Sequence, residues 1–287
     1  MTPDELRTID GDVYVSPRYL AGSTGFGDPA LAPLLDLGWD LEHDELCNAY
    51  VSSPDRKVRL GFLPEGEDDG LWRINAYKDP FGPPVWGVCF NEDTPTEVVL
   101  AFTTALAKAH EQGSDAYLVP PDPRHSDRDP FLAVVPLINR GWHLDRPRSG
   151  VFATQSPDGL ARLEFTSGHL DPAAELSTRD ARWHLWVGSS IDFPAWYATA
   201  STDTPVGLLQ AVTDCVADPT PVPRWREDTH SYLAGMARLT PILPPRPPSP
   251  TPLDVQRAAA RKPAVLNTSA VPRWSSTSRP ARPGARR

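Results

Sequence analysis

The chain has 287 residues, of which 40% are hydrophobic and 9% aromatic, enough to fill two ordinary domain cores. No apolar run reaches the roughly eighteen residues of a membrane span, and the acidic N-terminus MTPDELRTIDGD is unlike a secretory signal. We therefore expect a soluble, cytoplasmic protein without membrane contact. The three cysteines lie far apart and form no CxxC pair, which argues against a disulfide framework and against a zinc site.

The net charge of −9 divides sharply along the chain. Residues 1–245 hold 19 Lys and Arg against 36 Asp and Glu, whereas residues 246–287 hold 9 against 1. This basic tail is also rich in Pro, Ser and Ala and poor in large apolar residues. Because it cannot bury enough surface to offset the entropy of ordering, we expect residues 246–287 to be disordered.

Short β-rich runs with alternating apolar residues occupy most of the first ninety residues. Six such runs are DVYVSP (12–17), WDLEHD (39–44), NAYVS (48–52), KVRLGFL (57–63), LWRINAY (71–77) and VWGVCF (85–90). They predict one antiparallel sheet. Between the first two lies the Gly-rich stretch GSTGFGDP (22–29), which has neither the P-loop nor the GxGxxG order, so a loop entering a helix is favoured over an anion site.

The triplet Ser53-Pro54-Asp55 separates two of these strands. Proline presets φ at the first central position of a turn, and Asp bonds its own backbone, so the triplet predicts a hairpin turn that Arg56 completes.

A helix should follow the last strand of the unit. Thr94 as N-cap, Pro95 as the first helical residue and Glu97 at N3 give a capping-box pattern. An apolar stripe then includes Val98, Phe102 and Leu106. We expect this helix to cover the apolar face of the sheet.

The whole arrangement occurs twice. At an offset of 103 residues, Asp12, Tyr14 and Pro17 match Asp115, Tyr117 and Pro120, and the Ser-Pro-Asp triplet returns as Ser156-Pro157-Asp158, followed by Gly159. After a longer loop the offset becomes 110, where Trp86 matches Trp196 and Thr94 matches Thr204. The sequence thus predicts an α+β fold of two tandem copies, 12–112 and 115–218, each an antiparallel sheet with a C-terminal helix. A linker with a short helix, 219–245, and the Pro/Arg-rich tail follow.

A Ser-Pro-Asp hairpin, an RLGF-type strand, a Trp-bearing strand and a Thr-Pro-initiated helix together resemble the SPDY domain family. The resemblance covers about residues 12–218. The fourth letter of the family motif, Tyr, is Arg56 in the first copy and Gly159 in the second. The resemblance implies a domain of unknown function that occurs in tandem in actinobacterial proteins, and it implies no activity.

The sequence predicts no catalytic, cofactor or metal site. No histidine recurs with the Ser-Pro-Asp triplet, and the seven histidines lack HExxH or HxH spacing. The acidic run EGEDDG (65–70) lacks the alternating carboxylates of a calcium loop and is better explained as a solvated hairpin loop.

The tetrapeptide VPRW occurs at 222–225, in the linker, and again at 271–274, in the tail. Chance composition explains the coincidence, or else an isolated Trp serves as a docking anchor for the groove that the linker copy occupies. The candidate partner-binding residues are Trp225, Arg273, Trp274, Arg279, Arg282, Arg286 and Arg287.

Two functional classes stay open. The first is a noncatalytic interaction protein, whose paired acidic domains bind an unknown protein partner. Its basic tail makes weak, nonspecific contact with nucleic acid or another anionic surface, or else folds back on the acidic body. The second is an enzyme with an acidic site between the two repeats, built from Asp40, Glu42, Asp44 or Glu45.

Overall fold

The structure is a computed structural model, and it describes residues 11–64, 70–118, 129–145, 150–177, 181–229, 231–243 and 256–257. The chain divides into two units, Met1–Ile242 and Leu243–Arg287. Except for residues 256–257, the predicted tail lies outside the described residues, as does most of the acidic run 65–70. Within the described part of the chain, no helix is both long and apolar enough to cross a membrane.

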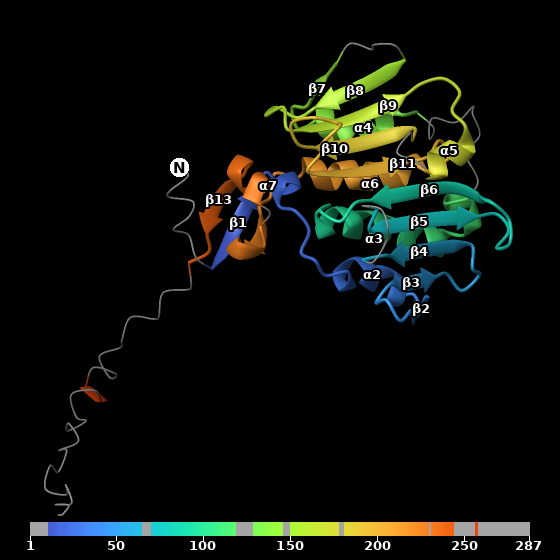
Figure 1. Ribbon diagram of the computed structural model, residues 1–287, viewed down its shortest axis with the longest axis horizontal. Coiled ribbons are helices and arrows are strands. Elements are labelled where there is room, and N and C mark those ends of the chain that lie inside the picture. Colours follow the sequence, from blue (N-terminus) through green and yellow to red (C-terminus); the bar gives the residue numbers. More distant parts are fainter. Residues whose placement is uncertain are drawn as a thin grey trace, which may run out of the picture. The chain divides into compact units, whose positions relative to one another are not determined.

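Ten of the described strands form one antiparallel sheet (Figure 1). In spatial order these are β2 (Asp40–His43), β3 (Ala49–Ser52), β4 (Val58–Phe62), β5 (Trp72–Tyr77), β6 (Pro84–Phe90), β11 (Trp196–Ala200), β10 (Trp183–Val187), β9 (Ala161–Thr166), β8 (Val151–Gln155) and β7 (His143–Leu144). A second sheet has the order β12 (Val222–Trp225), β1 (Asp12–Ser16), β13 (Arg238–Pro241).

The helices lie between and after these strands. The α-helices are α2 (Asp28–Leu35), α3 (Thr96–Gln112), α4 (Phe131–Ile138), α5 (Pro172–Ser177), α6 (Val206–Ala217) and α7 (Ser231–Met236). The short 3₁₀ turns are η1 (Arg18–Leu20), η2 (Ser114–Ala116) and η4 (Arg226–Asp228).

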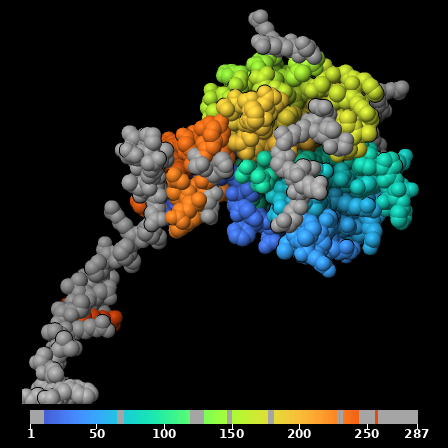
Figure 2. Space-filling model, in the orientation of Figure 1, coloured from blue at the N-terminus to red at the C-terminus, as the bar shows by residue number. Residues whose placement is uncertain are grey.

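The predicted α+β class, the antiparallel strands and the tandem arrangement are confirmed. The series α2, β2 to β6, α3 is followed by the series α4, β7 to β11, α6, and we call these the first and second repeat. The two repeats, blue to teal and green to orange, pack directly against each other (Figure 2).

The two repeats share a sheet because the last strand of each pairs with the other. Along this seam between β6 and β11, Cys89 lies opposite Thr199, and these two residues occupy the same position in their repeats, 110 apart. The seam therefore has local two-fold symmetry. The sequence does not predict this pairing, which turns two five-stranded sheets into one.

Hydrogen bonds extend the seam in a symmetric way. Asn91 accepts from the N–H of Tyr197 through Oδ1 (3.0 Å), and its own N–H donates to Tyr197 O (3.1 Å). At the equivalent place, Ser201 Oγ accepts from the N–H of Gly87 (3.0 Å), and Ser201 N donates to Gly87 O (3.0 Å).

The predicted capping box is wrong. Helix α3 begins at Thr96, and no side chain caps its N-terminus. Instead, the Thr94 hydroxyl lies 3.0 Å from Asn91 Oδ1 and 3.1 Å from Tyr197 O. The hydroxyl that the pattern predicted to cap the helix therefore forms its hydrogen bonds at the seam. Glu97 faces Arg224 rather than the helix start.

The placement of the first predicted strand also needs correction. β1 is a strand, but it pairs with β12 and β13 on its two sides and does not join the ten-stranded sheet. Alternating residues specify a strand with one buried face, and they do not specify its neighbours.

Aromatic side chains fill the space between strands and helices. Phe102 of α3 meets Trp86 and Phe90 of β6 edge to face, with ring centroids 6.3 and 5.6 Å apart. Trp86 and Trp196 are fully buried. Trp39 and Trp142, each directly after a glycine, are also buried.

Replacing Trp86 with Ala should lower the free energy of unfolding by about 3–5 kcal/mol, because the ring is fully buried and truncation leaves a cavity. The equivalent change Trp196→Ala should cost a similar amount. Denaturant unfolding measures both, and a loss below about 1 kcal/mol in either variant would contradict the packing described here.

Gly87 at the seam has no room for a side chain. A Cβ there would lie 2.7 Å from Leu176 Cδ2 of α5 and 2.7 Å from Asn75 Oδ1. Gly87→Ala should therefore destabilise the fold by about 1–3 kcal/mol. Adding Leu176→Ala should recover part of that loss, and strictly additive losses in the double variant would show that α5 does not press on the seam.

Candidate functional site

The two Ser-Pro-Asp triplets occupy equivalent hairpin turns. Ser53 O accepts from the N–H of Arg56 (2.8 Å), and Ser156 O accepts from the N–H of Gly159 (2.9 Å). The fourth position of each turn has positive φ, 57° at Arg56 and 76° at Gly159. Gly159 adopts this conformation without strain, whereas Arg56 does so at some cost. The predicted role of the triplet as a turn agrees with this geometry.

The serine hydroxyls are bonded on both sides. Ser53 Oγ accepts from Val58 N (3.0 Å) and donates to Asp55 Oδ1 (2.6 Å). Ser156 Oγ likewise accepts from Ala161 N (2.9 Å) and donates to Asp158 Oδ1 (2.5 Å). Both serines are buried. A buried serine whose hydroxyl donates its hydrogen bond to a carboxylate and accepts one from a backbone N–H holds the turn.

A tyrosine and a tryptophan complete each centre. Tyr117 donates its hydroxyl to Asp55 Oδ2 (3.2 Å), and its carbonyl accepts from Trp86 Nε1 (2.7 Å). In the second repeat, Tyr19 donates to Asp158 Oδ2 (2.7 Å), and its carbonyl accepts from Trp196 Nε1 (2.7 Å). We call these sets, Ser53/Asp55/Trp86/Tyr117 and Ser156/Asp158/Trp196/Tyr19, the first and second turn centre.

The turn centres correct one predicted equivalence. Tyr14, matched to Tyr117 at offset 103, lies exposed in β1, and the residue that does in the second repeat what Tyr117 does in the first is Tyr19. The missed signal is the dipeptide Tyr-Leu at 19–20 and 117–118, offset by 98. The N-terminal segment therefore completes the second repeat, and the segment between the repeats completes the first.

Electrostatics keep the tyrosines neutral. Burial raises the pKa of Tyr19 and of Tyr117 well above the ordinary value, and the adjacent carboxylates of Asp158 and Asp55 add to the effect. Burial opposes ionisation of Asp55 as well, but hydrogen bonds from Ser53, the Lys57 N–H and Tyr117 outweigh it and lower its pKa.

His110 belongs to the first turn centre and was not among the residues that the sequence singled out. Its Nε2 lies 3.9 Å from Asp55 Oδ1, and its ring stacks on Tyr117 with centroids 5.5 Å apart. Trp39 also meets the imidazole edge to face, with ring centroids 5.0 Å apart. Serine, carboxylate and imidazole do gather here, but not in the order of a catalytic triad, because the serine hydroxyl donates its hydrogen bond to the carboxylate and not to the imidazole.

The four carboxylates considered for an enzymatic site do not lie between the repeats. Asp40 and Glu42 are in β2, and Asp44 and Glu45 are in the turn after it, at the outer edge of the ten-stranded sheet. The side-chain amide of Asn48 lowers the pKa of Asp44, which also accepts from two backbone N–H groups. Asp44 thus organises its own turn.

Of the candidate partner-binding residues, the structure describes Trp225. It ends β12 and is 44% exposed. The neighbouring Arg224 is buried, where Nη2 lies 2.5 Å from Glu97 Oε2 and Nη1 lies 2.8 Å from Oε1. The other six, Arg273, Trp274, Arg279, Arg282, Arg286 and Arg287, lie outside the described residues.

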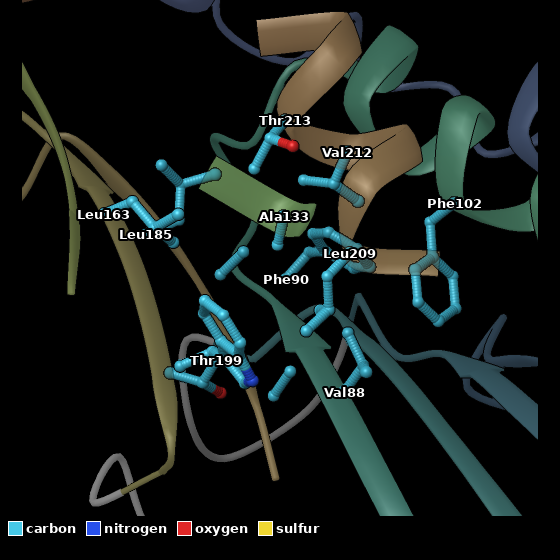
Figure 3. A pocket seen from close by; sticks show the side chains of 13 residues that line it. Val88, Phe90, Phe102, Ala133, Leu163, Leu185, Thr199, Leu209, Val212 and Thr213 are labelled. Carbon is cyan, nitrogen blue, oxygen red and sulfur yellow. The ribbon is translucent and has the colours of Figure 1, made fainter. Parts of the chain in front are cut away.

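Two pockets lie next to helices α3 and α6. A core cavity of about 30 Å³ lies beneath the seam, with side chains that include Phe90, Phe102, Leu209 and Val212 pointing into it (Figure 3). It has room for about one water molecule and is a packing void.

A larger groove of about 560 Å³, which we call the α3–α6 groove, is lined by Ala105, Lys108, Ala109, Gln112, Asp115, Ala116, Pro205, Val206, Gly207 and Leu208. Among the described residues, no cluster of three His, Cys, Asp or Glu could hold a metal ion.

The family model of the SPDY domain, a domain of unknown function (DUF317), matches residues 52–112 and 155–222. We call these two matched segments the first and second SPDY domain. Each match starts one residue before a Ser-Pro-Asp triplet and includes the long helix, α3 or α6, of its repeat. No curated protein and no solved structure matches the chain significantly.

Replacing Tyr19 with Phe should lower the free energy of unfolding by about 1–2 kcal/mol, because the Asp158 carboxylate loses a hydrogen bond that Tyr19 reaches from outside the matched SPDY domain. Tyr14→Phe, in the exposed face of β1, is the matched control and should be neutral. Equal effects of the two changes in chemical unfolding would remove Tyr19 from the second turn centre.

The lowered pKa of Asp55 predicts a pH dependence for the first SPDY domain. Its carboxylate contributes stability above the ordinary pKa of about 3.9, and this contribution is lost as pH falls through the lower pKa of the folded state. The difference in unfolding free energy between the natural protein and Asp55→Asn should shrink as pH falls below about 4. A difference that stays constant or grows between about pH 4 and about pH 2 would contradict this assignment.

Proposed function

We propose that the protein is a noncatalytic interaction protein. The repeats 12–112 and 115–218 act as paired acidic domains, each with its long helix over its half of the sheet, and the linker 219–245 and the basic tail 246–287 follow. The observation that carries the proposal is the state of the turn centres. The serine hydroxyl and the aspartate carboxylate of the Ser-Pro-Asp motif are bonded to each other and to a tyrosine from outside the matched segment, and they hold the hairpin, which supports a structural role for the recurring motif.

Charge gives the tail its role in this proposal. Nine basic residues against one acid, interleaved with Pro and Ser, suit contact with phosphates without a fixed fold. The remaining 245 residues carry a balance of −17, which repels a polyanion. We therefore expect the intact protein to bind nucleic acid weakly and without sequence preference.

The linker copy of VPRW supports a second contact, with a protein partner. In β12 this tetrapeptide buries Val222, pairs Arg224 with a carboxylate and leaves Trp225 half exposed. The tail copy offers the same groups, Arg273 and Trp274, to an acidic groove on the unknown partner. The alternative, an enzyme with an acidic site between the repeats, gains no support from Asp40, Glu42, Asp44 and Glu45, which lie at the sheet edge.

A salt titration of binding to a labelled DNA duplex tests the role of the tail. A full-length variant in which Arg273, Arg279, Arg282, Arg286 and Arg287 are replaced by Gln should bind more weakly at low salt. The slope of log K against log salt should fall by up to about 4–5, since each neutralised phosphate contributes about 0.9. An unchanged slope would mean that residues other than these five arginines contact the nucleic acid, or that the binding does not depend on charge.

A further inference from the structure

The turn between β5 and β6 (residues 78–83) presents a phenylalanine to solvent. Phe81 is 98% exposed. The turn beneath it is fixed, because Asp79 accepts from the N–H of Phe81 through Oδ1 (3.0 Å) and from the N–H of Gly82 through its carbonyl (2.9 Å). Arg59 adds a hydrogen bond to Pro80 O (2.7 Å) while its guanidinium lies 4.8 Å from the Tyr77 ring centroid. A ring held on a fixed turn loses little entropy when it docks.

This turn and the α3–α6 groove lie at the same end of the first SPDY domain. Tyr77 N donates to Lys57 O, which places the Phe81 turn beside the Ser-Pro-Asp turn. Asp55 in turn contacts His110 and Tyr117. The groove is lined by residues next to these two in sequence, among them Ala109, Gln112 and Ala116.

The counterpart of this groove in the second repeat is covered by the chain itself. At offset 110, Ala105, Lys108 and Gly207 correspond to Cys215, Asp218 and Glu97. Arg18 contacts two of these, with Nη2 at 2.7 Å from Asp218 Oδ2 and Nη1 at 3.6 Å from Cys215 Sγ. Arg224 of β12 pairs with Glu97.

The α3–α6 groove differs in chemistry from its covered counterpart. It has Lys108 where the counterpart has Asp218, and Gly207 where the counterpart has Glu97, so it offers no carboxylates at the positions that hold Arg18 and Arg224. Open space surrounds the position of a Cβ at Gly207. The segments that close one groove therefore do not suit the other.

The exposed turn complements the open groove. Small and apolar groups from Ala105, Ala109, Val206 and Leu208 line a volume of about 560 Å³, larger than a phenylalanine side chain, and Lys108 and Asp115 add one charge of each sign. The turn carries exposed Lys78 and Asp79 beside Phe81. Each charge on the turn thus has an opposite charge on the groove, which fixes an orientation as well as adding attraction.

We propose that two copies of the chain associate through this end, with Phe81 of each copy seated in the α3–α6 groove of the other. Because turn and groove are at the same end of one molecule, the contact is reciprocal under a two-fold axis and closes at a dimer. The proposal is independent of the tail and of the partners considered above.

The second repeat supplies a matched control. Phe193 in the turn between β10 and β11 is also strongly exposed, at 83%. The groove that corresponds at its end is the one that Arg18 and Arg224 cover. Phe193 therefore has the same exposed ring without a reciprocal acceptor.

Sedimentation velocity of the full chain over roughly 1–300 μM tests the proposal, with dimerisation expected in that range for an interface of modest size. Phe81→Ser should raise the dimer dissociation constant by about 30-fold or more, as for a central anchor residue. Phe193→Ser should leave it unchanged. Thermal unfolding of both variants should match the natural protein, since neither ring is buried.

A charge reversal tests the orientation. Lys78→Glu and Asp115→Lys change the other pair of opposite charges without removing the Asp79 hydrogen bond that fixes the turn. Each should weaken the dimer, and the double variant should return the dissociation constant to within about threefold of the natural value. A monomer at all concentrations would overturn the proposal. So would a dimer that is insensitive to Phe81→Ser, one that depends on Phe193, or a double variant weaker than either single change.

Discussion

The pairing of β6 with β11 is the interaction on which the rest of the structure depends. Each repeat alone would be a five-stranded sheet whose last strand has an open edge, and such an edge is a site of uncontrolled pairing. In the duplicated chain, the open edge of the last strand in each repeat pairs with the equivalent strand of the other repeat. The symmetric bonds of Asn91 with Tyr197 and of Ser201 with Gly87 extend the pairing beyond the strands and bring in Thr94 at the start of α3.

Each turn centre joins the sheet of its repeat to a segment outside that sheet, Tyr117 between the repeats or Tyr19 near the N-terminus. An aspartate fixed by its serine receives a tyrosine hydroxyl, and the backbone of that tyrosine receives a buried tryptophan N–H from the strand beside the seam. The serine, tyrosine and tryptophan of each centre are buried, and their burial is tolerable because each of their polar side-chain groups is paired. In the second SPDY domain the tyrosine comes from the start of the chain, so the N-terminal segment and the C-terminal repeat are held together across a separation of 139 residues.

Much of this was predictable from constant offsets in the sequence. The α+β class and the hairpin role of Ser-Pro-Asp follow from periodicity and turn chemistry, which are local, and the duplication follows from the constant offset. The seam does not follow, because β6 resembles an ordinary strand and WYATA of β11 is buried on both faces and shows no alternation. Thr94 has the form of an N-cap, and the choice between helix and seam depends on Tyr197, 103 residues away. Tyr19 and His110 could not be predicted for the same reason, since their partners are distant in the sequence and are brought close only by the fold. For Tyr19 the sequence holds one weak signal, the repeated dipeptide Tyr-Leu.

Amide hydrogen exchange tests the central claim that the seam makes the two SPDY domains one folding unit. The N–H groups of Gly87, Asn91, Tyr197 and Ser201 are each bonded across the seam. If the account is correct, they exchange only when the whole sheet unfolds, at the same rate as amides within β5 and β10. Faster exchange at these four positions than in β5 and β10 would show that the domains open from each other as separate units, and would contradict the account.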